Sequence, residues 1–461
     1  MTNITIIGAG VSGVFLTIQL IRKTHGLPLS ITLIEKEKEP WLGVAYSTDK
    51  PFHLLNVRAS KMSALAGEDD HFLSWLAEND YQVHADDFAP RSVYRKYVKE
   101  LFEKTLADIP ANINFNFIHE EAVDIKHLNE HEAIVHLRNK QTVVSNFIVL
   151  ALGNFITNSP LTENFSSSGP YYDNPWIPDL LDNIKKDATV FILGTGPTMI
   201  DTALALYYQR HEGKITAISR HGLIPAEHAA TKIYPDFADE MENVTSLPVA
   251  VKIVRNHIAI AEDNGIGWRA VIDSMRPHTR NWWLNISLQG KINFIKYYKT
   301  YWEVARSRLP EECAIVIKEM INAGQLNVTP GRITAIEKQD SRIIVKYTNT
   351  KSGSTHADAA DVVINCMGPG LNYEKIKHPL LESLVKQGLL CNSPACYGVN
   401  ALPDGTIIKK DGTASTMMFT LGLPLRGVLW ETIAIPEIRM EAKELAELIL
   451  QKINFLRSAH K

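Results

Sequence analysis

The chain has 461 residues, of which 45% are hydrophobic and 21% are charged, and its formal net charge is −3. This length corresponds to about three domains or subdomains of ~150 residues each, and the composition is that of a globular protein with a large core. The near-neutral charge excludes strong electrostatic attraction to nucleic acid or to an anionic membrane. No apolar run reaches the roughly 18 residues that a transmembrane helix needs.

The N-terminal residues 4–35 read as a βαβ unit. Ile-Thr-Ile-Ile at 4–7 is entirely β-branched and predicts a buried parallel strand. Apolar residues then recur at helical spacing over 11–24, and a second strand at 30–34 ends at Glu35. The pattern predicts the first half of a nucleotide-binding sheet.

The next elements are less regular. We expect a loop-rich stretch over 40–70, helices over 71–107, a strand at 112–118 and strands over 121–150. A second βαβ unit follows, with a strand at 189–193, a helix at 198–210 and a strand at 214–219. After it we expect a mostly helical, tryptophan-containing region at about 225–310, strands over 326–348 and at 360–368, and a C-terminal helix over 436–456.

The first unit carries a complete dinucleotide fingerprint. Gly8 permits the tight turn, Gly10 allows a pyrophosphate to approach the backbone, and Gly13 lets the helix pack close to the sheet. The helix N-terminus then presents free N–H groups to the phosphates. Glu35 stands where a carboxylate accepts hydrogen bonds from ribose hydroxyls and repels a 2′-phosphate, so this loop suits FAD or NAD(H) rather than NADP(H).

The second unit departs from this pattern. Gly194 and Gly196 repeat the first two glycine roles, whereas Met199 replaces the third glycine. The strand ends at Ser219-Arg220, with no acid at the ribose position, and an arginine there can bind a 2′-phosphate or stack on adenine. We therefore expect NADPH here rather than NADH, with an empty, degenerate unit as the alternative.

The order of these elements predicts an α/β protein with two Rossmann-like dinucleotide-binding domains, the NAD(P) domain being inserted into the FAD domain. We expect the first part of the FAD domain at 1–160, the NAD(P) domain at 161–350 with the helical excursion at about 225–310, and the return to the FAD domain with the C-terminal helix at 351–461.

Several further stretches carry a family resemblance. They are Gly43-Val-Ala-Tyr46, His53-Leu-Leu-Asn56, Met62-Ser63, Pro90-Arg91-Ser-Val-Tyr94, Ala151-Leu-Gly153-Asn154, Asn365-Cys-Met-Gly368-Pro and Gly427-Val-Leu-Trp430-Glu431. With the two glycine loops, they resemble the bacterial FAD/NAD(P)-binding protein family over nearly the whole chain. More distantly, the chain resembles the N-hydroxylating and Baeyer–Villiger flavin monooxygenases.

The resemblance implies FAD at the first loop, a flavin-side segment around Gly43–Tyr46 and Leu55–Met62, and closure of the FAD site by Gly422–Trp430. Thr420-Leu-Gly422-Leu-Pro stands where many such flavoproteins have a Gly-Asp pair. The cofactor-binding residues expected from the loops and the resemblance are Gly8, Gly10, Ser12, Gly13, Glu35, Tyr46, Asn56, Met62, Gly153, Gly194, Gly196, Ser219, Arg220, Gly368, Gly422 and Gly427.

Other polar residues have competing interpretations. Asn56 and His53 are the candidates for a catalytic role beside the flavin, although a structural hydrogen bond is an alternative for His53. Asp201 complements the dipole of its helix or contacts a ligand. The Trp282-Trp283 pair packs a core or lines a substrate cavity. Arg276, Arg280 and Arg306 are solvated or receive an anionic substrate.

The four cysteines are Cys313, Cys366, Cys391 and Cys396, too few for a disulfide framework in a chain of this length. They fit a reducing compartment, and no signal peptide is expected ahead of the first strand, so we expect a cytoplasmic protein. Cys391 and Cys396 have the C-x4-C spacing of one class of flavin disulfide reductases, with two ordinary loop cysteines as the alternative. The histidines lack metal-ligand spacing, so no metal site is expected.

These features predict an FAD-dependent oxidoreductase in which NAD(P)H reduces FAD. The electrons then pass to oxygen, as in a monooxygenase, or to another small acceptor. A flavin disulfide or quinone reductase and a non-catalytic flavin-binding sensor are the alternatives. A small-molecule substrate is expected.

Overall fold

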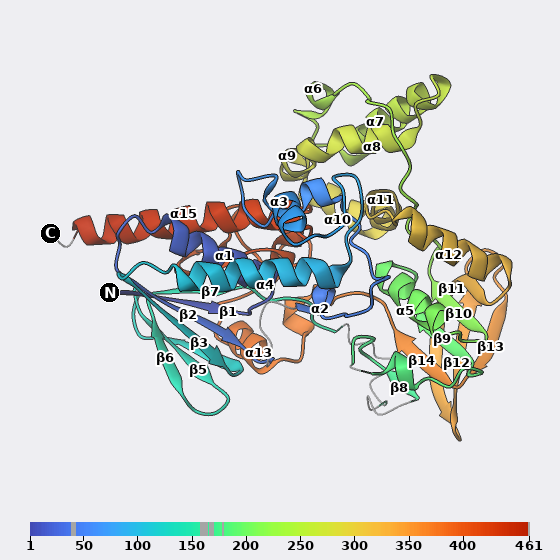
Figure 1. Ribbon diagram of the computed structural model, residues 1–461, viewed down its shortest axis with the longest axis horizontal. Helices are drawn as coiled ribbons and strands as arrows, with labels where there is room; N and C mark the ends of the chain where they lie inside the picture. The colour runs from blue at the N-terminus through green and yellow to red at the C-terminus, as the bar shows by residue number, and fades with distance from the viewer. Residues whose placement is uncertain (38–42, 157–164, 166–169, 178, 460–461) are drawn as a thin grey trace.

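The computed structural model describes residues 1–37, 43–156, 165, 170–177 and 179–459. Within these residues the chain forms two large, mainly parallel sheets and a separate group of helices (Figure 1). The first sheet has the strand order β15-β16-β7-β1-β2-β3. Its strands are β1 (Thr2–Ile7), β2 (Leu29–Glu35), β3 (Ile113–His119), β7 (Phe147–Leu150), β15 (Thr406–Ile408) and β16 (Ala414–Thr420).

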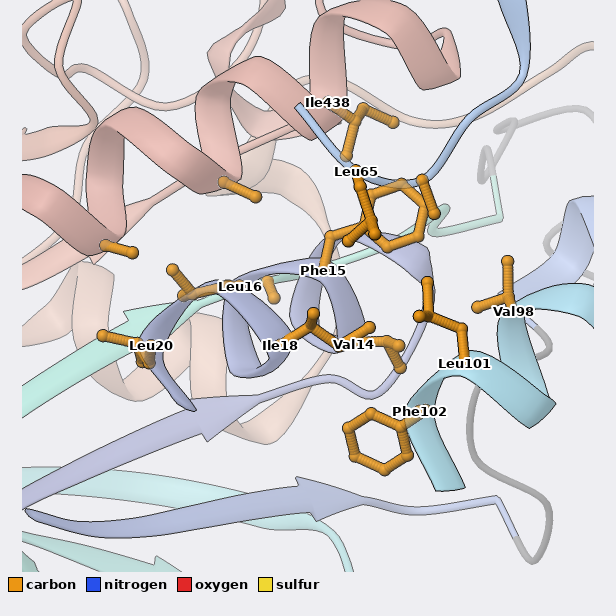
Figure 2. Close-up of a cluster of buried hydrophobic side chains, with 14 of the residues drawn as sticks. Val14, Phe15, Leu16, Ile18, Leu20, Leu65, Val98, Leu101, Phe102 and Ile438 are labelled. Carbon is orange, nitrogen blue, oxygen red and sulfur yellow. The ribbon is translucent and has the colours of Figure 1, made fainter. Parts of the chain in front are cut away.

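Side chains alternate between the two faces of this sheet, as the pleat of a strand requires. Ile4 and Ile6 enter one buried cluster, and Ile7 enters another on the opposite face. Helices cover the first face: α1 (Val11–Lys23), α3 (His71–Glu78), α4 (Arg91–Ala107) and α15 (Ile435–Ala459). Figure 2 shows side chains of α1 and α4 and Ile438 of α15 in this cluster. The other face is covered by α13 (Pro379–Lys386) and by the antiparallel strands β4 (Ala122–His127), β5 (Ala133–Leu137) and β6 (Thr142–Ser145).

The second sheet has the order β13-β12-β11-β10-β9-β14-β8. Its strands are β8 (Tyr171–Tyr172), β9 (Val190–Leu193), β10 (Ile215–Ser219), β11 (Leu326–Gln339), β12 (Arg342–Asn349), β13 (Thr355–Ala360) and β14 (Val362–Asn365). The central strands are parallel, and β12 and β13 extend the sheet in antiparallel pairing. Helices α5 (Pro197–Tyr208) and α12 (Glu311–Asn322) share a buried cluster with the parallel strands.

The helical excursion has its own core. Its helices are α6 (Ala238–Met241), α7 (Leu247–Asp263), α8 (Trp268–Met275), α9 (Thr279–Asn285), α10 (Leu288–Asn293) and α11 (Lys299–Arg306). Trp282 and Trp283 are buried in this core, which confirms the packing interpretation. Trp430, which follows α14 (Arg426–Leu429), inserts into the same cluster and so joins the excursion to the C-terminal part of the chain.

The predicted fold class is confirmed: two Rossmann-like units and a helical excursion are present in the expected order. Three details differ. A loop divides the helical region 71–107 into α3 and α4. β13 and β14 belong to the second sheet, so the chain returns to the first sheet later than the expected boundary at 351. The expected boundary at 160/161 falls outside the described residues.

The short helix α2 (Gly43–Tyr46) follows β2 and lies close to α4. Among the described residues, no helix is both long enough and apolar enough to cross a membrane.

Candidate functional site

The first glycine loop makes the tight turn that the sequence predicts between β1 and α1. Gly8 has φ +106°, and a Cβ there would lie 2.4 Å from the carbonyl oxygen of Ala151. A Cβ on Gly13 would lie only 1.9 Å from the carbonyl oxygen of Gly8. At Gly10, by contrast, the nearest described atom would be Gly43 Cα at 3.9 Å. The backbone at the N-terminus of α1 is therefore open, and this cradle fits a pyrophosphate.

The second glycine loop repeats the geometry of the first. Gly194 has φ +107°, and its Cβ would lie 2.4 Å from the carbonyl oxygen of Cys366. The amide of Gly194 donates to Ile218 O at 2.8 Å, as the amide of Gly8 donates to the carbonyl oxygen at the equivalent position in β2, also at 2.8 Å. An added Cβ on Gly196 would meet no described atom within 4 Å. This loop also fits a pyrophosphate.

Met199 fills the position of the missing third glycine without closing the loop. Its side chain is fully buried in the cluster between the parallel strands and α12, so it points into the core of the domain. The loop backbone ahead of it keeps the open approach at Gly196. The departure from the fingerprint therefore changes the packing of α5 and not the space for a ligand.

Glu35 is held at the rim of the first loop. Its Oε2 accepts a hydrogen bond from Ala9 N at 2.8 Å, and its Oε1 accepts one from Lys36 N at 2.8 Å. Oε1 also accepts from Glu37 N at 3.2 Å, so of the roughly four lone-pair positions of a carboxylate one remains, on Oε2, for a ribose hydroxyl. The loop itself thus orients the group that the sequence assigns to the ribose.

The equivalent place in the second unit carries a serine and an arginine. Ser219 Oγ accepts from Thr195 Oγ1 at 2.8 Å and from Gly222 N at 3.1 Å, so this side chain fixes the loop. Arg220 is exposed and borders a cavity, and the described residues include no ion-pair partner for its guanidinium. A 2′-phosphate would meet a free cation here.

A cavity of about 830 Å³ lies between the two units. Its lining brings together many of the residues that the sequence assigns to cofactors. From the first unit these are Tyr46, Asn56 and Met62, and from the second unit they are Gly194, Gly196, Ser219, Arg220 and Gly368. Burial raises the pKa of Tyr46, so its phenol stays protonated. One cavity is therefore lined both by residues expected beside the flavin and by residues of the second glycine loop.

The segments that connect the units run side by side at this cavity. Gly153 follows β7 and Gly368, with φ +83°, follows β14. Further along, Gly370 N donates to Phe155 O at 2.8 Å, and Ile156 and Pro369 form an antiparallel bridge. This pairing fixes the crossing point of the chain between the two units.

The C-terminal segment closes on the first loop, as the resemblance implies. Gly422 has φ +72°, and a Cβ there would lie 2.7 Å from Ser12 Oγ. The amide of Gly422 donates at 2.8 Å to Oε2 of Glu441, which also accepts from the Thr432 hydroxyl through Oε1. Burial raises the pKa of Glu441 to about 7. A carboxylate does reach this segment, but it comes from α15 rather than from the position after the glycine.

Gly427 has a structural role that protein contacts explain. A Cβ there would lie 2.0 Å from Tyr397 O and 2.4 Å from Ser393 Oγ. Its carbonyl oxygen accepts a hydrogen bond from Trp283 Nε1 at 3.2 Å. The close approach of the 393–398 loop requires glycine here, independently of any cofactor.

The two catalytic candidates lie in different environments. His53 is buried, with Nδ1 2.7 Å from Thr48 Oγ1 and Nε2 3.0 Å from Asp201 O. Burial lowers its pKa, and the neutral ring donates through Nε2 to the carbonyl. This is the structural alternative considered for His53. Asn56 is exposed and borders the cavity, while His228 contacts its backbone carbonyl at 3.1 Å.

Asp201 lies beyond the first turn of its helix and borders the cavity. Its carboxylate forms a two-point ion pair with Arg91, the first residue of α4. Arg91 Nε also donates to Leu54 O at 3.1 Å. The structure therefore gives Asp201 a bond between the two units in place of a role at the start of its helix, and contact with a ligand stays a prediction.

The cysteines divide into two pairs. Cys313 and Cys366 border the cavity, and burial raises their pKa to about 11 and about 12. Cys391 is half-buried, Cys396 is exposed, and both are free thiols in the loop before β15. Burial also raises the pKa of Cys391.

Charged residues gather on the wall of the cavity formed by α11 and α14. They are Lys299, Glu303, Arg306, Arg308, Arg426 and Glu431. Arg306, one of the arginines considered for an anionic substrate, is paired with Glu431 and Glu437. Of the other two, Arg276 lies 3.2 Å from Asp273, and Arg280 contacts Glu444 on α15.

Comparison with known families decides the nature of the first unit. A family model described as FAD-NAD(P)-binding matches residues 5–155. Residues 5–155 are therefore similar to an FAD-NAD(P)-binding domain. The matched range contains the first glycine loop, Glu35 and the flavin-side residues, so the open cradle at Gly10 lies within a recognised cofactor-binding domain.

One curated relative matches half of the chain. The uncharacterized protein YdhS of Escherichia coli strain K12 is 25% identical over 244 residues, which is 50% of this chain and 44% of YdhS. The match therefore covers less than half the length of that relative.

Solved structures share the fold over nearly the full length. The ornithine hydroxylase PvdA of Pseudomonas aeruginosa has a TM-score of 0.65 at 13% identity, with 98% of this chain and 100% of that chain covered. The FAD-bound cadaverine monooxygenase DfoA of Erwinia amylovora has a TM-score of 0.66 at 11% identity, with 97% of this chain and 94% of that chain covered. The bacillithiol disulfide reductase Bdr of Staphylococcus aureus has a TM-score of 0.55 at 15% identity, with 98% of this chain and 99% of that chain covered. The chain therefore has the fold of two-dinucleotide-binding flavoproteins.

Sequence reasoning missed three functional contacts around the FAD-NAD(P)-binding domain. Arg91 lies in a motif that the resemblance singled out, but its partner was not predicted. Arg426 had no signal of its own. The sequence did carry a signal for Glu441. It lies on the same face of α15 as the buried residues Ile438, Ala442 and Leu445, and a carboxylate on a buried face needs polar partners.

Proposed function

We propose that the chain is an FAD-dependent NADPH oxidoreductase of the monooxygenase type that acts on a small molecule. The observation that carries this proposal is the matched geometry of the two glycine loops, together with a cavity that borders the second loop and the flavin-side residues Tyr46, Asn56 and Met62. Gly8 and Gly194 adopt the same left-handed turn, and Gly10 and Gly196 both leave their backbone open. Two such cradles, with a cavity that joins the second one to the expected flavin side, suit one donor and one acceptor of hydride.

The residues have separate roles in this proposal. Gly10 and the N-terminus of α1 hold the FAD pyrophosphate, and Glu35 holds the adenosine ribose. Gly196 holds the NADPH pyrophosphate, and Arg220 neutralises the 2′-phosphate. When bound, FAD would supply the redox chemistry between NADPH and oxygen. Asn56 and Met62 border the cavity on the flavin side and shape the space for the substrate.

The thiols argue against a disulfide reductase. A thiol exchanges with a disulfide as the thiolate, so a reductase needs an accessible cysteine of low pKa. Burial instead raises the pKa of both cysteines that border the cavity, Cys313 and Cys366. The fold of the chain is also more similar to the hydroxylases, with TM-scores of 0.65 and 0.66, than to the bacillithiol disulfide reductase at 0.55.

A non-catalytic flavin-binding sensor requires an empty second unit. Met199 was the reason to consider it, but its side chain lies in the core and leaves the approach to Gly196 open. Free Arg220 at the rim of the cavity adds a second feature of a working nucleotide site.

The test is the stoichiometry of turnover. Purified protein with bound FAD is supplied with NADPH and oxygen, and NADPH oxidation, oxygen uptake and peroxide release are followed together. We expect slow NADPH oxidation that a substrate accelerates, with less peroxide released per NADPH. Rapid reduction of a quinone or disulfide, without oxygen uptake, would contradict the monooxygenase proposal.

A further inference from the structure

Arg426 is a buried cation that borders the cavity. It is the first residue of α14, only 8% exposed, and it borders the cavity. Its guanidinium carbon lies 5.7 Å from the ring centroid of Tyr397 and 5.1 Å from that of Trp430. Aromatic rings at these distances stabilise the cation and restrict its orientation.

The hydrogen-bonding capacity of Arg426 is not used up by the protein. Nη2 donates to Glu303 Oε1 at 2.7 Å. Nε is buried and has no acceptor among the described residues. A buried donor without a partner is costly, and a guanidinium satisfies two adjacent donors best with a planar oxyanion. The unused Nε therefore points to an anionic ligand.

The other arginines of this wall are also ion-paired. Arg306 lies 3.5 Å from Glu431 and 3.2 Å from Glu437. Arg308 lies 2.9 Å from Asp273. Arg306 Nε also has no hydrogen-bond acceptor among the described residues, but Arg306 is paired with two carboxylates, whereas Arg426 is paired with Glu303, which Lys299 shares.

Glu303 is shared between two cations. It accepts from Arg426 and lies 3.8 Å from Lys299 Nζ. Glu303 thus faces two positive charges, and Glu431 also acts electrostatically on Arg426. A ligand carboxylate beside Lys299 and Arg426 would add to this compensation.

The backbone at Trp430 holds this arrangement in place. Trp430 has φ +65° and ψ −63°, a conformation that non-glycine residues adopt rarely and that tends to occur at functional sites. The packing of its ring on Trp283 and Phe294, with centroids 4.8 and 5.0 Å apart, fixes this conformation. The strained turn therefore places Trp430 beside Arg426 at the cavity wall.

Apolar side chains border the same part of the cavity. Leu423 precedes Arg426 in the chain, and Ile433 and Ile435 follow Trp430. A ligand that pairs with Arg426 would place its remaining atoms against these side chains.

We propose that Arg426 binds the carboxylate of an organic acid with an apolar body, and that this acid is the substrate class of the enzyme. The assignment to substrate rests on the function proposed above. The binding of a carboxylate to Arg426 does not require that function.

The test is a titration of the FAD-loaded full-length protein, followed by tryptophan fluorescence, because Trp430 and Trp302 lie at this wall. The probes are hexanoate, its neutral analogue hexanamide and the cation hexylamine. We expect hexanoate to bind at least about tenfold more tightly than either of the others. Equal binding of hexanoate and hexanamide, or tighter binding of hexylamine, would overturn the proposal.

Four variants sharpen the titration. Arg426→Gln should weaken hexanoate binding about tenfold, and Arg426→Lys should weaken it less. Glu303→Gln removes the competing carboxylate and should strengthen hexanoate binding, a gain that misfolding does not mimic. Arg255→Gln, an exposed arginine on α7 outside the cavity lining, is the matched control and should bind as the wild type does. Unchanged binding in both Arg426→Gln and Glu303→Gln would overturn the proposal, as would loss of FAD from Arg426→Gln with hexanoate binding intact.

This readout needs neither NADPH nor oxygen, so the two proposals fail separately. If hexanoate binds as expected but NADPH does not reduce the FAD, the proposed oxidoreductase function is contradicted and the proposed carboxylate site is supported. If NADPH reduces the FAD but substitution of Arg426 does not change hexanoate affinity, only the proposal of a carboxylate site is contradicted.

Discussion

Arg91 and Asp201 form a two-point ion pair between the two nucleotide units, with N–O distances of 2.8 and 3.1 Å. Arg91 begins α4 beside the first sheet, and Asp201 lies in α5 beside the second. Their side chains are only 15% and 8% exposed. His53 from the first unit also bonds the carbonyl oxygen of Asp201. The relative orientation of the two cofactor sites therefore depends on a bond that is largely shielded from water.

Removing one partner of this pair should destabilise the protein strongly. Arg91→Met leaves the Asp201 carboxylate buried and unpaired, and the loss of one partner of a buried pair costs about 3–5 kcal/mol. Denaturant unfolding followed by circular dichroism measures the change. Lys99→Met, which breaks an exposed pair with Glu103 on the same helix, should change stability by less than about 1 kcal/mol. The account would be wrong if both variants had the same small effect.

Gly10 and Gly13 should respond differently to alanine. Gly10 has φ −69° and open space beside it, so Gly10→Ala should fold normally but bind FAD much more weakly. Gly13→Ala would force a Cβ to within 1.9 Å of Gly8 O and should lower the melting temperature of the FAD-free protein. Thermal melting and the flavin content of the purified variants measure the two effects. Full FAD content in Gly10→Ala would contradict the assignment of this loop.

Arg220 should determine the preference for NADPH. A charge-assisted contact with the 2′-phosphate contributes about 1.5–3 kcal/mol, so Arg220→Ala should raise the KM for NADPH at least about tenfold. The KM for NADH, which lacks that phosphate, should change little. Steady-state kinetics with both coenzymes decide the point. An equal rise for both coenzymes would show that Arg220 does not recognise the phosphate.

Glu441 should make stability fall as the pH rises. Burial raises its pKa from 4.5 to about 7 in the folded protein, so the folded state binds the proton more tightly than the unfolded state does. Glu441 contributes roughly 3 kcal/mol to the free energy of unfolding below about pH 4.5, and this contribution is lost as the pH rises through about 7. Glu441→Gln should remove this part of the pH dependence. The measurement is the free energy of unfolding of both proteins from pH 4.5 to 8, and parallel curves would contradict the prediction.

The local elements could be predicted from the sequence because their signals are local. Glycine spacing and short β-branched strands locate both βαβ units, and a left-handed turn explains Gly8 and Gly194 alike. The pair of Arg91 and Asp201 could not be predicted, since 110 positions separate them and a charge near a helix start already has a local explanation. The assignment of β13 to the second sheet depends on antiparallel pairing with β12, which strand pattern alone does not reveal.

The most direct test of the central claim is the anaerobic reduction of bound FAD by NADPH, followed by the visible absorbance of the flavin. We expect the wild type to bleach rapidly with NADPH and more slowly with NADH. Gly196→Ala should retain its FAD, since an added Cβ meets no described atom within 4 Å, but it should be reduced by NADPH far more slowly. A wild-type protein that carries FAD and stays oxidised with both coenzymes would contradict the claim that the two glycine loops form a donor and an acceptor site.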